Sequence, residues 1–327
     1  MEALDQVLAR LETNLDSVEN RRLHALEQRS KCYNLLLVIG GGILVICLFL
    51  SQAYGAFVFI PGVIATFIAS IISWMVVAAP AAKEFRTSFK TDVVTELVRT
   101  IQPKVRFAPD RGIECSLFRA TQLFPTSPDR YATEDQLAGK VGETDVLIAE
   151  INAEEKRTRT DSDGDTETYY VTIFKGVMMV ADFHKNFQGV TRVLPDNESG
   201  IFGAMGKAMQ GFFPFGSKDL VRMEDPDFEN HFQVYSSDQV EARYLLSTTM
   251  MRRILSLRNA WKGANIRISF VDSMVNVAIP LKGNFFEPRL QESLHGSSQI
   301  QRVAEELKSC FDLVEDLNLD TRIWARE

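Results

Sequence analysis

The most regular feature of the hydrophobic pattern is a long apolar run, residues 32–82, which contains no Lys, Arg, Asp, Glu or His. A membrane-spanning helix needs about 20 apolar residues, so the run is long enough for two crossings. Its most polar point is residues 51–55, and Pro61 soon afterwards suits the first turn of a helix. The pattern predicts a transmembrane helical hairpin, with spans at about residues 33–51 and 57–79.

Small residues are the candidates for the contact between the two spans, because they let helix backbones approach in lipid. They are Gly40, Gly41 and Gly42 on the first span and Gly62, Thr66, Ala69, Ser70 and Ser73 on the second. The alternative is that small residues are simply common in spanning helices. Neither span contains an ionisable side chain of the kind that marks an ion pathway, so transport by the hairpin alone is disfavoured.

Positive charges flank the hairpin on both sides and are missing from its connecting loop. They are Arg21, Arg22, Arg29 and Lys31 before it, and Lys83, Arg86, Lys90 and Arg99 after it. Loops rich in Lys and Arg stay in the cytoplasm. We therefore expect a multi-pass protein of the bacterial cytoplasmic (inner) membrane with both termini in the cytoplasm.

Residues 1–31 read as one amphipathic helix. Its apolar seam consists of Leu4, Leu8, Leu11, Leu15 and Val18. The spacing of four and three is that of a coiled coil, but we expect the seam to end before Arg22 and Ala25. It either packs against another helix of the same chain or mediates self-association.

A second amphipathic helix is predicted directly after the hairpin, over residues 83–102, before Pro103 stops it. Its apolar stripe is Phe85, Phe89, Val93, Val94, Leu97, Val98 and Ile101. The stripe is wider than the short N-terminal seam would cover. Because such surfaces are seldom left in water, we expect a homo-oligomer held through these two helices.

Residues 103–222 are predicted to be rich in β-structure. Two runs of β-branched, aromatic and aliphatic residues, 145–153 and 169–183, predict a long hairpin whose turn lies at Asp163-Gly164. Asp161, Asp163 and Asp165 partly match a calcium loop. That pattern places its glycine at the sixth position, not the fourth, and uses flanking helices. Calcium is therefore disfavoured, and we predict no metal-binding residues.

A segment of alternating glycine and large apolar residues follows at residues 199–217. Its large side chains are Phe202, Met205, Met209, Phe212, Phe213 and Phe215. One interpretation is an apolar lid packed on the domain. The other is an exposed segment that contacts the bilayer or a partner, since exposed apolar patches usually mark interfaces.

Residues 223–327 alternate between helical and strand patterns. A short strand from Phe232 to Tyr235 precedes Asp238, which has the position of a helix N-cap, with Glu241 as the second half of a capping box. Arg243 is predicted to be structural, buried in an ion pair. A helix over residues 248–261, a hairpin over 266–279 with its turn at Asp272-Ser273 and an amphipathic helix over 300–319 complete an α+β fold. The apolar stripe of the last helix is Ile300, Val303, Leu307, Phe311, Val314 and Leu317.

Composition excludes several classes of function. The net charge is −7 and no basic run occurs, so a nucleic-acid partner is not expected. The four cysteines form no C-x-x-C pair, which disfavours a zinc site or a disulfide framework. No G-x-S-x-G, H-E-x-x-H or G-x-G-x-x-G motif is present. We therefore predict no catalytic residue and no cofactor, and an enzyme is disfavoured.

Two stretches, TYYVTIFKG and DPDFENHFQVYSSDQVEARYLL, carry a resemblance to a known family. They resemble an uncharacterised bacterial family of membrane-anchored proteins that is known only as a domain of unknown function. Its members share F-x-V-Y-S-x-D-Q-x-E-A-R-Y and often have Thr-Pro where this chain has Ser247-Thr248. The resemblance implies a possible partner, because members are often encoded beside LemA-type membrane proteins. It implies no catalytic residue.

Two hypotheses for function follow. The leading one is a membrane protein whose cytoplasmic α+β domain mediates protein interaction or assembly. The alternative is a membrane-anchored domain that binds a lipid or small ligand and uses residues 199–217 as its gate.

Overall fold

The computed structural model describes residues 2–55, 59–160, 165–183, 185–196, 219–296, 298–317 and 319. They form two compact units, a helical unit of Met1–Leu97 with Glu287–Val303 and a sheet unit of Val98–Phe286 with Ala304–Glu327.

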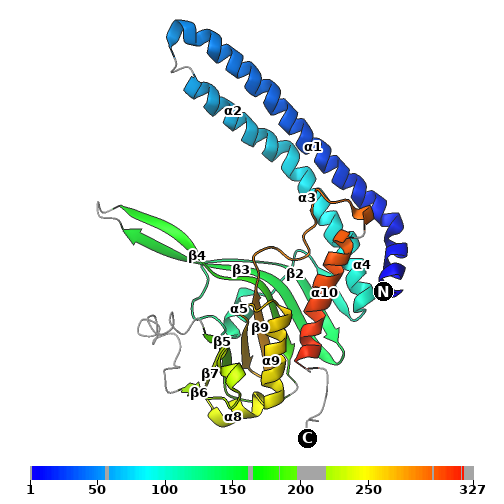
Figure 1. The fold of residues 1–327 in the computed structure, drawn as a ribbon, viewed down its shortest axis with the longest axis vertical. Coiled ribbons are helices and arrows are strands. Elements are labelled where there is room, and N and C mark those ends of the chain that lie inside the picture. The colour runs from blue at the N-terminus through cyan, green and yellow to red at the C-terminus, as the bar shows by residue number, and fades with distance from the viewer. Residues whose placement is uncertain are drawn as a thin grey trace. The chain divides into compact units, whose positions relative to one another are not determined.

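The helical unit is built on α1 (Glu2–Tyr54), a continuous helix of 53 residues. The sequence predicted an N-terminal helix and a separate first span, but no proline or glycine interrupts residues 2–39, so the two are one helix. The chain returns along α1 through α2 (Phe59–Ser73), and Figure 1 shows the two as a hairpin. Both helical arms of this hairpin are long and apolar enough to cross a membrane.

The returning arm contains two π-helical segments. The order is η2 (Trp74–Ala78), α3 (Ala79–Ser88), η3 (Phe89–Val94) and α4 (Thr95–Ile101). The first π segment precedes Pro80 in the first turn of α3. A proline lacks an N–H and clashes with the carbonyl four residues before it, and a local π turn accommodates that defect without ending the helix.

The apolar stripe predicted after the second span is buried. Phe85, Phe89, Val93, Val94 and Leu97 are each at most 1% exposed. The stripe is therefore covered within the chain, and exposed apolar surface there no longer argues for a second copy. The homo-oligomer itself stays a prediction.

The predicted end of the N-terminal seam is wrong. Leu15 and Val18 are buried, and so are Arg22 and Ala25, where the seam was expected to stop. The buried stripe continues because Arg22 is neutralised by Glu19 on the same helix.

The sheet unit contains one antiparallel sheet of nine strands, in the order β1-β2-β3-β4-β9-β8-β5-β7-β6. The strands are β1 (Val105–Ala108), β2 (Arg130–Val141), β3 (Thr144–Thr160), β4 (Thr166–Asp182), β5 (Thr191–Pro195), β6 (Leu220–Val221), β7 (Phe232–Ser236), β8 (Arg267–Val271) and β9 (Met274–Pro280). Strands from the predicted regions 103–222 and 223–327 therefore share one sheet. The predicted α+β class is confirmed.

Helices lie between and after the strands. They are α5 (Cys115–Ala120), α7 (Pro226–Glu229), α8 (Gln239–Leu245), α9 (Thr248–Ala260), the 3-10 turn η6 (Leu294–Gly296) and α10 (Ser298–Asp316). The final amphipathic helix is confirmed, and each apolar residue of its predicted stripe that falls within α10 is buried. Strand β2 and helix α5 were not predicted, because the polar and apolar residues of β2 do not alternate regularly.

The β3–β4 hairpin is longer than predicted, since the polar stretch after Ala153 remains in strand β3. In Figure 1 its outer part projects beyond the rest of the sheet. The hairpin β8–β9 turns at Asp272 and Ser273, where the sequence predicted the turn. Their φ values of 52° and 61° are those of a type I′ turn.

Side chains are buried on both faces of the sheet. Met178 and Met179 point to opposite faces, as adjacent strand residues must, and both are fully buried. On the Met178 face, α5 contributes Phe118, whose ring stacks on Phe124 with centroids 5.1 Å apart. Both methionines therefore contribute to core packing.

Candidate functional site

The glycine and phenylalanine segment, with Phe202, Met205, Met209, Phe212, Phe213 and Phe215, lies outside the described residues. So do Asp161 and Asp163 of the partial calcium motif. The hypotheses of a lid and of an exposed contact segment both stay predictions.

The signature residues of the C-terminal region, Phe232, Tyr235, Asp238, Glu241 and Arg243, lie along β7 and into α8. Phe232 is buried in the strand, and Tyr235 is half-buried. Asp238 caps α8, because its carboxylate accepts hydrogen bonds from the amides of Val240 (2.8 Å) and Glu241 (3.1 Å). The predicted N-cap is confirmed.

The predicted capping box is only half correct, because Glu241 bonds elsewhere. Its carboxylate accepts from the amides of Gln188 (3.0 Å) and Gly189 (2.7 Å), while the amide of Asp238 donates to the Ser236 hydroxyl. Glu241 therefore fastens the loop before β5 to α8. Sequence spacing could not reveal this bond, since the partners are more than fifty residues apart.

The prediction of a buried ion pair at Arg243 is wrong. Arg243 is exposed, and its guanidinium donates to the carbonyl oxygens of Gln239 (3.2 Å) and Arg222 (3.5 Å). Among the described residues it has no carboxylate partner within ion-pair distance. Arg243 lies in the last turn of α8 and points outward because Ala242 and Leu245 occupy the buried side of this short helix.

The buried cation near this cluster is Arg192 on β5, which the sequence analysis missed. It pairs with Tyr235 across the β5–β7 ladder and is 5% exposed. Burial lowers the pKa of the Arg192 guanidinium to about 10, and the charges of Tyr235 and Asp219 oppose that change. Burial also raises the pKa of the Tyr235 phenol. At neutral pH a charged guanidinium thus lies beside a neutral phenol.

Three acidic side chains gather at a bulge between β2 and β3. One carboxylate oxygen each from Glu134, Asp135 and Glu150 lie within 4.8 Å of one another. The amide of Phe285 donates to Glu150 (2.7 Å), and the register shifts just after Glu134. The observed role of Glu150 is therefore to bind the chain that follows β9. Sequence spacing missed this group because its members come from two strands, and the absence of a metal site stays a prediction.

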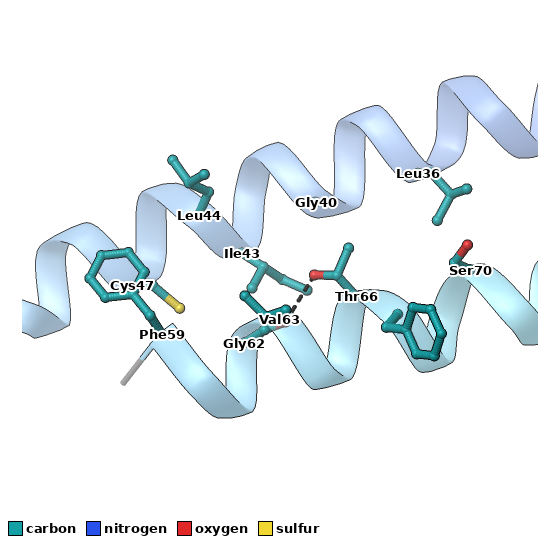
Figure 2. A pocket seen from close by; sticks show the side chains of 11 residues that line it. Leu36, Gly40, Ile43, Leu44, Cys47, Phe59, Gly62, Val63, Thr66 and Ser70 are labelled. Carbon is teal, nitrogen blue, oxygen red and sulfur yellow. Dashed lines mark hydrogen bonds between the residues drawn. The ribbon is translucent and has the colours of Figure 1, made fainter. Parts of the chain in front are cut away.

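The helical hairpin has a groove along the contact of α1 and α2, drawn in Figure 2. Its volume is about 470 Å³. A Cβ atom on Gly62 would lie 2.5 Å from Cys47 Sγ, and one on Gly40 would lie 3.2 Å from the Thr66 methyl group. Of the predicted contact residues these two glycines are confirmed, since small residues there let the helices approach. Gly41 is not part of the contact, because a Cβ there would meet nothing within 4 Å; the same holds for Gly42.

The residues lining this groove are apolar or small. They are Leu36, Gly40, Ile43, Leu44, Cys47, Phe59, Gly62, Val63, Thr66, Phe67 and Ser70. The Thr66 hydroxyl donates to the Gly62 carbonyl (2.9 Å), so its polarity is satisfied within α2. The hydroxyl donor of Thr66 is therefore already used, and the surface that the groove offers is mainly apolar.

Most large apolar side chains of the hairpin point outward. Val38 is 72% exposed, Phe49 77% and Phe67 66%. A water-soluble domain would bury such residues against another element. The hairpin instead has the surface of a structure surrounded by lipid.

Comparisons with known proteins agree with part of the resemblance. Residues 172–319 match the model of a family described as "Protein of unknown function (DUF3137)". No curated protein matches the sequence. A solved structure, the crystal structure of the mycobacterial trehalose monomycolate transport factor A, TtfA, is similar at 12% identity and a TM-score of 0.29, covering 64% of this chain and 88% of that chain. That score is too low to indicate a common fold. The comparisons thus support a family of unknown function for residues 172–319, and the association with LemA-type proteins stays a prediction.

Proposed function

We propose that this chain is an integral protein of the bacterial cytoplasmic membrane that binds another protein through its sheet unit. In this proposal α1 and α2 cross the bilayer, and both termini lie in the cytoplasm.

The observation that carries the membrane assignment is the exposed apolar surface of the hairpin. Helices satisfy their own backbone hydrogen bonds and can therefore enter lipid. The arms Leu15–Gln52 and Phe59–Ile101 both exceed the length needed for one crossing. Large side chains such as Val38 and Phe49 would be solvated by acyl chains in place of water.

The orientation is supported by the charges at the ends of the two arms. Lys31 precedes the apolar part of α1, and Lys83 and Arg86 follow that of the returning arm. Because the arms form a hairpin, these charges lie at the same end, and the positive-inside rule assigns that end to the cytoplasm.

Reporter fusions test the topology. Alkaline phosphatase fused after Glu327 should be inactive and green fluorescent protein there should fluoresce, whereas phosphatase inserted at Gln52 should be active. An active phosphatase at Glu327 would overturn the orientation. Extraction by alkaline carbonate would overturn the membrane assignment itself.

The protein-binding role is supported by the outer part of the β3–β4 hairpin. Strand β2 pairs with β3 only as far as Glu154, and β9 pairs with β4 only from Gly176 onward. Beyond these points no other described strand pairs with either outer edge, although the Lys156 amide donates to the Asp129 carboxylate (2.7 Å). An edge without a partner strand is the arrangement that accepts an added strand. Tyr169 and Tyr170 lie on this ribbon, 42% and 36% exposed.

Affinity purification of the full-length protein from mild detergent, followed by mass spectrometry, tests this role. A specific partner, a LemA-type protein or a second copy of the chain, should be recovered with the native protein and lost with Tyr169→Ser/Tyr170→Ser. Tyr244→Ser is the matched control, because Tyr244 is a similarly exposed tyrosine on α8. Equal recovery with both variants would remove the ribbon from the proposal.

A further inference from the structure

A second hollow lies along the same hairpin, at the end where the charged residues begin. Its volume is about 850 Å³. The lining residues are Leu26, Arg29, Ser30, Tyr33, Leu36, Ser70, Ile71, Trp74, Met75 and Gln291. We call it the interfacial groove.

The interfacial groove combines three kinds of side chain. Ile71 and Met75 form an apolar wall. Tyr33 and Trp74 are aromatic, and their exposed fractions are 65% and 59%. Tyrosine and tryptophan are enriched where a membrane meets water. The side chain of Arg29 supplies positive charge.

Arg29 differs from the neighbouring cation. Lys31 forms an ion pair with Glu27, with Nζ and Oε1 2.7 Å apart. Among the described residues no carboxylate lies within ion-pair distance of Arg29, and the lining of the groove includes no Asp or Glu. The charge on Arg29 is thus available to an anion from outside the chain.

The interfacial groove continues into the groove between α1 and α2. Leu36 and Ser70 line both hollows, and Figure 2 places these two residues together at one end of the groove that it draws. The combined surface is apolar over the middle of the hairpin and cationic at its charged end. This is the polarity of a phospholipid, with acyl chains at one end and a phosphate at the other.

One lining residue of the interfacial groove, Gln291, comes from outside the two helical arms. Gln291 belongs to a segment whose neighbours are bound by α1, since Arg22 donates to the Leu290 carbonyl (2.8 Å) and Leu294 donates its amide to Glu19 (3.0 Å). The backbone on either side of Gln291 is therefore anchored to α1, and Gln291 lines the groove.

We propose that this groove binds an anionic glycerophospholipid of the cytoplasmic leaflet. The lipid phosphate contacts Arg29, with Ser30 and Gln291 as hydrogen-bonding neighbours, and one acyl chain lies along Leu36 toward Ile43. The inference rests on the proposed insertion of the hairpin with its charged end in the cytoplasm.

Native mass spectrometry of the full-length protein in mild detergent tests the site. Titration with phosphatidylglycerol should give tighter binding than titration with phosphatidylethanolamine. Arg29→Gln should weaken phosphatidylglycerol binding about fivefold, the effect of one cation at an anionic surface. Lys31→Gln is the matched control, with the same charge change, and should alter the affinity less than twofold.

A second pair of variants tests the apolar part. Ser70→Phe fills the point where the two hollows meet and should reduce phosphatidylglycerol binding at least fivefold. Ile72→Phe, at an exposed position that lines neither hollow, should leave binding unchanged. Variants that retain resistance to carbonate extraction remain inserted, so a loss of lipid selectivity alone is distinguished from failure of the membrane assignment.

Three results would overturn the inference. The first is equal weakening by Arg29→Gln and Lys31→Gln, which would mean general surface attraction. The second is equal binding of the two lipids by the native protein. The third is a lipid-free dimer whose contact is broken by Ser70→Phe, which would make the groove an interface between copies.

Discussion

Glu19 and Arg22 lie one turn apart on α1 and form a buried ion pair, with Arg22 Nη2 2.7 Å from Glu19 Oε1. The pair also binds a distant segment, because Arg22 donates to the Leu290 carbonyl and Glu19 accepts from the Leu294 amide. Lys90, buried on η3, forms an ion pair with Glu287 (2.9 Å). Two buried cations thus fasten residues 287–294 to both arms of the helical unit.

Glu19→Ala should destabilise the helical unit strongly. Removing one partner leaves Arg22 buried without its carboxylate, which costs about 3–5 kcal/mol. Thermal unfolding of the full-length protein in detergent, followed by intrinsic fluorescence, measures the change. Glu27→Ala is the control, because Glu27 pairs with Lys31 on the exposed side of the same helix, and its melting curve should overlay that of the native protein.

Gly62→Val should push α1 and α2 apart. A side chain there would overlap Cys47 Sγ, 2.5 Å from the position of a Cβ, and overpacking of this kind costs about 1–3 kcal/mol. Gly41→Val adds the same atoms where a Cβ meets nothing within 4 Å. A lower melting temperature for the first variant alone is expected, and equal melting temperatures would contradict the helix contact.

Gly176→Ala should weaken the pairing of β4 with β9. Gly176 has a φ of 154°, and a Cβ would lie 2.9 Å from both the Leu281 nitrogen and the Pro280 Cα. Those atoms belong to the backbone and cannot rotate away. Gly283→Ala, where a Cβ meets nothing within 4 Å, is the control. Hydrogen exchange of the β9 amides should rise only in the first variant.

Glu241→Ala should destabilise the sheet unit while Arg243→Ala should not. The Glu241 carboxylate accepts from two backbone amides, and hydrogen bonds to charged groups contribute about 1.5–3 kcal/mol. Arg243 lies at the surface, where substitutions usually change stability by less than about 0.5 kcal/mol. Denaturant unfolding compares the two, and a larger loss at Arg243 would restore the structural role first expected for it.

The apolar and polar pattern by itself determined the elements that depend on local chemistry. The hairpin followed from the uncharged run of residues 32–82, the cap from Asp238, the turn from Asp272-Ser273 and the last helix from its apolar stripe. Each of these elements is formed by residues that are close in the sequence. Local propensity and hydrophobic periodicity are therefore enough to predict it.

Only the tertiary structure decided which distant groups meet. Arg22 looked like the end of an apolar seam, yet it is buried because Glu19 neutralises it and the Leu290 carbonyl accepts a hydrogen bond from its guanidinium. Glu241 looked like half of a capping box, yet two amides more than fifty residues earlier bind it. Charged side chains reach whichever backbone groups packing brings close, and that proximity is set by the whole fold, not by spacing along the chain.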